Sequence, residues 1–100
     1  MEVEVKGKRL EERKYMRVGV DLSSVNLRTP AHSGVTDNVS RHGARILTSK
    51  PLRPNERLDL RSMLGSYRSR ARVVYCVAEG EMYAVGLQFY ASVGDWISPE

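Results

Sequence analysis

Apolar residues recur at every second position through most of the chain from Val18 onward. The stretch "RLDLRS" at residues 57–62 is the clearest case, with its two leucines in one phase and its arginines and aspartate in the other. Successive side chains of a β-strand point to opposite faces of a sheet, so this alternation is typical of strands with one buried face. The pattern constrains the chain to an all-β fold.

Residues with turn chemistry, mainly glycine and proline, divide the alternating region into six segments. After Leu22 the apolar phase slips by one residue, which predicts a β-bulge. Six short strands predict a closed or nearly closed six-stranded antiparallel β-barrel. The expected strands lie near 18–27, 35–40, 44–49, 57–62, 71–77 and 83–89, with a hairpin turn at "EGE", 79–81.

Each of the last two strands is expected to contribute one apolar face to the core or to sheet packing. In the fifth, Ala71, Val73, Tyr75 and Val77 share one phase of the alternation. In the sixth, the corresponding residues are Val85, Leu87 and Phe89.

One hundred residues are enough for a single domain with one core. We divide the chain into a flexible basic arm at 1–12, a barrel domain at 13–91 and a C-terminal tail at 92–100. The arm is rich in lysine and arginine and has too little apolar surface to dock firmly. The tail is compatible with a short helix or an irregular segment, and its Trp96 is expected to pack back onto the barrel.

Three features favour a cytoplasmic protein without a membrane segment. The longest apolar run, 73–78, is far shorter than the roughly 20 residues that span a bilayer. The first residues alternate acids with valines and lack the apolar stretch of an export signal. Cys76 is the single cysteine, so an internal disulfide is impossible, which fits a reducing compartment.

The sequence favours a binding module over an enzyme. Asp37, Ser40 and His42 are the residue types of a hydrolase triad, but around one strand end their side chains cannot form the required relay. Two histidines and one cysteine are too few and too scattered for a zinc site. A glycine-rich loop that could cradle a phosphate is missing too. We therefore expect no catalytic residue, no metal and no cofactor.

Two short motifs carry a resemblance to a known family. Arg13 and Arg17 lie four residues apart at the junction of arm and barrel, and "NVSRHG" at 38–43 follows further along the chain. With both motifs in this order and strand context, the chain resembles the PilZ domain family of bacterial receptors for the second messenger cyclic di-GMP. The stretch "YAVGLQF" at 83–89 is also similar to the last strand of that family.

The resemblance implies a PilZ-like split barrel that binds cyclic di-GMP and signals through a downstream protein. The implied ligand-binding residues are Arg13, Arg17, Asn38, Ser40 and Gly43, with Arg41 and Asp37 beside them. An arm that carries arginines can close over the ligand, so we expect the arm to become ordered when the ligand binds.

The implied roles agree with the chemistry of the ligand. The planar fork of an arginine donates two parallel hydrogen bonds to a phosphate, or to O6 and N7 of guanine. Asn38 and Ser40 can each offer a donor and an acceptor to a guanine edge. Gly43 allows a positive φ or a close approach of the backbone to the ligand. Arg41 can stack on a base or reach a phosphate.

Other interpretations of these residues stay open. The two arginines can form a solvated face with Glu11 and Glu12, and the polar residues of "NVSRHG" can simply cap a turn. A second function is that of a small basic barrel that binds single-stranded nucleic acid. Nucleic acid is disfavoured because the formal charge of +4 is spread over arm and turns, and the few aromatic residues lie mostly in the core phase. A third function is a PilZ-like barrel that binds only other proteins.

Overall fold

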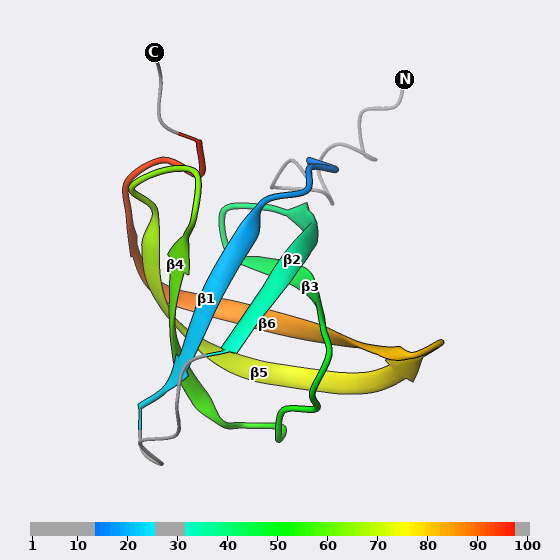
Figure 1. Ribbon diagram of the computed structural model, residues 1–100. Helices are drawn as coiled ribbons and strands as arrows, with labels where there is room; N and C mark the ends of the chain where they lie inside the picture. The colour runs from blue at the N-terminus through cyan, green and yellow to red at the C-terminus, as the bar shows by residue number, and fades with distance from the viewer. Residues whose placement is uncertain (1–13, 26–31, 98–100) are drawn as a thin grey trace, which may run out of the picture.

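The computed structural model describes residues 14–25 and 32–97 of the chain. These residues form six antiparallel strands that close into a barrel, in the order β1-β2-β3-β6-β5-β4 (Figure 1). The predicted all-β, six-stranded antiparallel barrel is confirmed. The strands are β1 (Gly19–Ser24), β2 (His32–Val39), β3 (Gly43–Thr48), β4 (Arg57–Ser62), β5 (Arg68–Glu79) and β6 (Met82–Val93).

The two longest strands, β5 and β6, have twelve residues each and form one hairpin. A two-residue turn at Gly80 and Glu81 joins them, as "EGE" predicts. Gly80 has a φ of 64°, a left-handed conformation that glycine adopts at little cost. The hairpin extends past the other strands on one side of the barrel (Figure 1).

The barrel interior is filled by the apolar phase of the strands. Every strand contributes, and the largest fully buried aliphatic side chains are Leu22, Ile46, Leu58, Leu60, Val18, Val20, Val73 and Val85. Aromatic rings close one end, where Trp96 stacks on Tyr67 with ring centroids 4.1 Å apart and Phe89 packs against both. Trp96 therefore packs back onto the barrel as expected. Residues 94–97 form no helix, and β6 continues to Val93, past the boundary predicted at residue 91.

The bulge predicted in the first strand is wrong. β1 pairs with both β2 and β4 without a register shift, and it ends at Ser24. The apolar phase slips there because the strand stops at the two serines. The register shifts lie instead in β2 at Asp37, in β5 at Val74 and in β6 at Tyr90.

Several predictions concern residues outside the described part of the chain. These are the arm at 1–12, Arg13, Leu27 and the last residues of the tail, 98–100. Within residues 14–25 and 32–97, no helix is long and apolar enough to cross a membrane.

Candidate functional site

Four strands place a row of polar, glycine and aromatic residues side by side on the outside of the barrel. Asn38 of β2 lies opposite Arg45 of β3, and Arg45 lies opposite Gly86 of β6. Gly86 in turn lies opposite Tyr75 of β5. Residues that are directly opposite in a sheet have neighbouring side chains. Asn38, Arg45 and Tyr75 are therefore arranged around a position that has no side chain.

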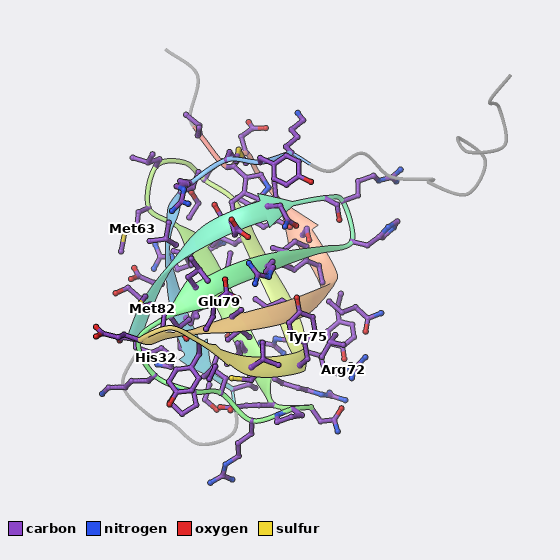
Figure 2. All side chains as sticks on the ribbon, turned by 90° about the vertical axis from the view of Figure 1, so that its right-hand side faces the viewer. His32, Met63, Arg72, Tyr75, Glu79 and Met82 are labelled. Atoms are coloured by element: carbon purple, nitrogen blue, oxygen red, sulfur yellow. The ribbon has the colours of Figure 1, made fainter. Side chains whose placement is uncertain are left out.

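A second row lies one step along the same four strands. The backbone N–H of Ser40 donates to the carbonyl of Gly43 at 2.8 Å, which closes the turn between β2 and β3. Gly43 lies opposite Gln88, and Gln88 lies opposite Arg72. The Arg72 guanidinium donates to Oε1 of Gln88 at 2.7 Å, and it also donates to Asn55. Figure 2 shows Arg72 and Tyr75 close together along β5.

The two rows surround an open pocket of about 380 Å³ on the barrel surface. It brings together three of the motif residues, Asn38, Ser40 and Gly43. The remaining walls come from β3, β5 and β6 and include Arg45, Val74, Tyr75, Gly86 and Gln88.

Register shifts in two strands turn Asn38 and Tyr75 toward this pocket. In β2, Gly34 and Thr36 face the interior, so a regular strand would also bury residue 38. The extra residue at Asp37 reverses the phase, so Val39 is buried and Asn38 faces outward.

A register shift also reverses the alternation in β5. Ala71 and Val73 are buried, and a regular strand would place Tyr75 and Val77 on the same face, as predicted. The shift at Val74 leaves Tyr75 40% exposed and Val77 49% exposed, so the predicted single face for all four residues is wrong. Tyr75 packs on the outer face of the sheet instead. The predicted buried face of β6, formed by Val85, Leu87 and Phe89, is confirmed.

Two glycines are required because other atoms occupy the space of a side chain. A Cβ at Gly86 would come 2.2 Å from Cε2 of Tyr75, so the tyrosine ring lies directly over this glycine. A Cβ at Gly43 would come 2.3 Å from the carbonyl oxygen of Leu87. Gly43 does not have a positive φ, and the close approach that it permits is to β6 of the barrel.

Two carboxylates hold the Arg45 guanidinium at the edge of the pocket. It forms ion pairs with Asp37 and Glu79, with N–O distances of 2.5 Å each. The hydrogen bond from Arg45 to Asp37 raises the pKa of Arg45, against the opposing effect of burial, and Glu79 adds to the rise. Asp37, predicted to bind ligand, thus contacts Arg45 and does not line the pocket.

The other predicted ligand residues lie around the pocket. Arg41 is exposed in the β2–β3 turn and lines a neighbouring hollow with Lys14, Tyr67 and Trp96. Arg17 is exposed on the segment before β1 and lines neither hollow. Arg13 lies outside the described residues.

The segment that carries Arg17 lies along β2. The backbone groups of Lys14 and Val39 exchange two hydrogen bonds, at 2.8 and 2.9 Å. The Thr36 hydroxyl donates to the carbonyl of Met16 and accepts from the N–H of Val18. Both sides of Arg17 are therefore fixed beside the bulge of β2 that presents Asn38.

The motifs alone did not identify Tyr75, Arg45 and Gln88 as parts of the site. One signal was available, because a glycine inside a strand, such as Gly86, often marks a close approach of another group. The pairing of Arg45 with Asn38 and of Gln88 with Gly43 depends on the strand order, which the sequence does not state. Among the described residues, no group of histidine, cysteine and acidic side chains could hold a metal ion.

Comparisons with known proteins identify the family and the fold of this chain. The PilZ domain family model matches residues 8–95. Among solved structures, the Bacillus subtilis inhibitor of motility (MotI/DgrA) is similar, with a TM-score of 0.71 at 14% sequence identity. The match covers 83% of this chain and 43% of that one, so this chain spans less than half the length of that protein. The likeness shows a shared fold. No curated protein sequence matches this chain.

Proposed function

Because this chain belongs to the PilZ domain family, we propose that it is a receptor for cyclic di-GMP that signals through a protein partner. The observation that carries the proposal is that Asn38, Ser40 and Gly43 line one pocket together with an exposed tyrosine ring. PilZ domains are binding and adaptor modules, so no catalytic step is proposed for this site.

The pocket offers the two kinds of contact that a guanine base needs. The amide of Asn38 can donate to and accept from a base edge, and the Ser40 hydroxyl can do the same. The Tyr75 ring, held over Gly86, offers a flat apolar surface on which a base can stack. Hydrogen bonds at the edge and stacking on the face together orient a purine.

The phosphates need cations that are not already neutralised. Arg45 is held by two carboxylates, so we assign it to the wall of the pocket and not to phosphate binding. Arg17 is exposed and lies on a segment fixed beside β2, and Arg13 lies one motif step before it. We propose that these two arginines bind the phosphates, and that the N-terminal segment changes its arrangement as they do so.

Calorimetric titration with cyclic di-GMP tests this function. We expect a dissociation constant in the micromolar range or tighter, which corresponds to about −8 kcal/mol or better. GTP and linear diguanylate should bind much more weakly, because neither presents the closed ring with two phosphates. An absence of heat and of backbone NMR shifts around Asn38 and Tyr75 at high ligand concentration would remove the proposed function and leave the fold untouched.

A further inference from the structure

One outer face of the barrel, far from the motif residues in sequence, is dominated by arginine. The outward positions of β4 and of residues 68–72 in β5 hold five arginines and one aspartate. We call this surface the arginine face; its residues are Arg57, Asp59 and Arg61 of β4 and Arg68, Arg70 and Arg72 of β5. Five of the sixteen basic residues of the chain therefore lie on two neighbouring strands, in addition to those of the arm and turns.

The strand register places like charges directly opposite one another. Arg57 lies opposite Arg72, and Arg61 lies opposite Arg68, while Asp59 lies opposite Arg70 between the two pairs. Like charges at directly opposite positions destabilise a sheet. Folding alone gives no reason for this arrangement, whereas an anionic partner would relieve the repulsion.

Part of the face is already neutralised, and part is free. Arg70 forms an ion pair with Asp59 at 3.0 Å, and the Arg57 guanidinium lies over the ring of Tyr90. Within the part of the chain that the structure describes, the guanidinium groups of Arg61 and Arg68 have no hydrogen-bond or ion-pair partner. The free end of the arginine face is therefore this pair.

A hollow beside the free pair combines cations with apolar surface. It has a volume of about 610 Å³, and its walls include Arg61, Arg68, Ala91 and Val93. Val93 is 64% exposed, although it belongs to a regular strand. Arginine next to exposed aliphatic side chains is typical of protein interfaces, in which Arg is enriched relative to the rest of the surface.

We propose that the arginine face binds an extended acidic segment of a partner protein, in which carboxylates alternate with apolar residues. Alternate residues of an extended chain repeat about every 6.6 Å, and Arg68, Arg70 and Arg72 are themselves alternate residues of the extended strand β5. The two repeats match, so successive carboxylates can meet successive guanidinium groups. The bidentate geometry of arginine suits a carboxylate.

Two observations favour protein over nucleic acid as the occupant. Asp59 lies in the middle of the face and would repel a phosphate chain that crosses it. Single-stranded nucleic acid is held largely by stacking on aromatic rings, and Tyr90, the half-exposed ring that borders this face, already has the Arg57 guanidinium over it. A peptide can place a hydrogen-bond donor opposite Asp59 and a carboxylate on either side.

Fluorescence anisotropy with a labelled peptide of about eight residues, in which Glu alternates with Val except for one central Ser that faces Asp59, tests the proposal. The matched probes are the same peptide with Gln for Glu, and an oligothymidylate. The full chain is used without nucleotide, so the result does not depend on cyclic di-GMP binding. We expect the Glu peptide to bind, the Gln peptide to bind at least about tenfold more weakly, and backbone NMR shifts to appear on β4 and β5.

Charge reversal separates this face from general positive charge. Arg68→Glu should weaken peptide binding by about tenfold or more, and it should keep or raise the melting temperature because the new carboxylate would lie opposite Arg61. Arg61→Glu should weaken peptide binding as much, but it should not raise the melting temperature, because its carboxylate would lie opposite both Arg68 and Asp21 of β1. The control, Lys50→Glu, makes the same change of charge in the exposed connection after β3 and should change binding little.

Three results would overturn the proposal. The first is that the Glu peptide does not bind, and the second is that Lys50→Glu weakens binding as much as Arg68→Glu. The third is that oligothymidylate binds the same arginines more tightly than the peptide, which would assign the face to nucleic acid.

Discussion

Gly43→Ala is predicted to damage the barrel, because the motif glycine is required by the fold. The new Cβ would come 2.3 Å from the carbonyl oxygen of Leu87, about 1 Å inside an ordinary contact. That oxygen belongs to the β6 backbone and is held in place by the neighbouring hydrogen bond from Phe89 N–H to the His42 carbonyl, at 2.8 Å. It cannot rotate away, so β3 and β6 must separate locally.

Overpacking of this kind costs about 1–3 kcal/mol. For a domain of this size, each kcal/mol lowers the melting temperature by roughly 4–8 °C, so we expect a loss of about 5–20 °C. The assay is thermal unfolding followed by circular dichroism, with calorimetric titration of cyclic di-GMP on the same samples. Ligand binding should weaken as well, because Gly43 lines the pocket.

Ser40→Ala is the matched control for the same motif. The Ser40 hydroxyl makes one long hydrogen bond, 3.3 Å to the Gly43 carbonyl, so its loss should cost less than about 1 kcal/mol. The alanine variant should melt within a few degrees of the wild type and still bind cyclic di-GMP more weakly. If Gly43→Ala melts as the wild type does, the close contact with Leu87 is refuted as the reason for the glycine.

The remaining predictions concern the phosphate cations, the stacking ring and the alkaline limit of stability. Arg17→Ala should weaken cyclic di-GMP binding by about ten- to a hundredfold in calorimetry. The control Arg53→Ala, which removes an exposed loop charge, should leave binding unchanged. Equal losses of affinity in the two variants would mean that the ligand responds only to the overall positive charge. Tyr75→Ala should lose about tenfold or more in affinity while Tyr75→Phe keeps most of it, because the ring and not the hydroxyl covers Gly86; an unaffected alanine variant would exclude stacking. Burial raises the pKa of Tyr67, so its stabilising contribution is complete below the ordinary pKa near 10 and is lost as the pH rises above it. As the pH rises from about 9 to 11, the free energy of unfolding in urea should therefore fall less for Tyr67→Phe than for the wild type. Identical pH profiles of the two proteins would contradict this.

The barrel could be predicted from the sequence because the apolar alternation is strong and the turns are well marked. β4 begins and ends where "RLDLRS" does, and the turn between β5 and β6 lies at "EGE". The motif residues of "NVSRHG" also come together in one pocket, since they lie on one tight turn and the strand before it. Local sequence was enough for these features.

The register shifts could not be predicted in the same way. A slip of the apolar phase indicated a bulge after Leu22, where the strand in fact ends. The register shifts at Asp37 in β2 and at Val74 in β5 produce no visible slip in the apolar pattern of the sequence, because the residues that follow them are polar or can lie on either face of a strand. Tyr75 was placed on one face with Ala71 and Val73 for this reason.

The arginine face escaped prediction for a different physical reason. Arginines alternate visibly in "RSRAR" at 68–72, but their effect depends on which strand lies beside them. Only the antiparallel pairing of β4 with β5 places Arg61 opposite Arg68. Alternation along one strand predicts which residues face outward, and it says nothing of what they face across the ladder.

The register shifts in β2 and β5 have the same effect on the residues that border the pocket. In a regular strand, alternate residues face the core, so each outward residue lies between two buried neighbours along the chain. The extra residues at Asp37 and Val74 interrupt this alternation where β2 and β5 border the pocket. Asn38 and Tyr75 therefore face outward, and the residues after them, Val39 and Cys76, face the interior. Beyond the shifts, Val39 of β2 is buried, and Cys76 of β5 is partly buried and packs against the core. On the proposed function, Asn38 and Tyr75 are therefore outward residues whose side chains face the ligand, whereas Gly43 and Gly86, which hold the strands and the ring in contact, cannot change without moving the barrel.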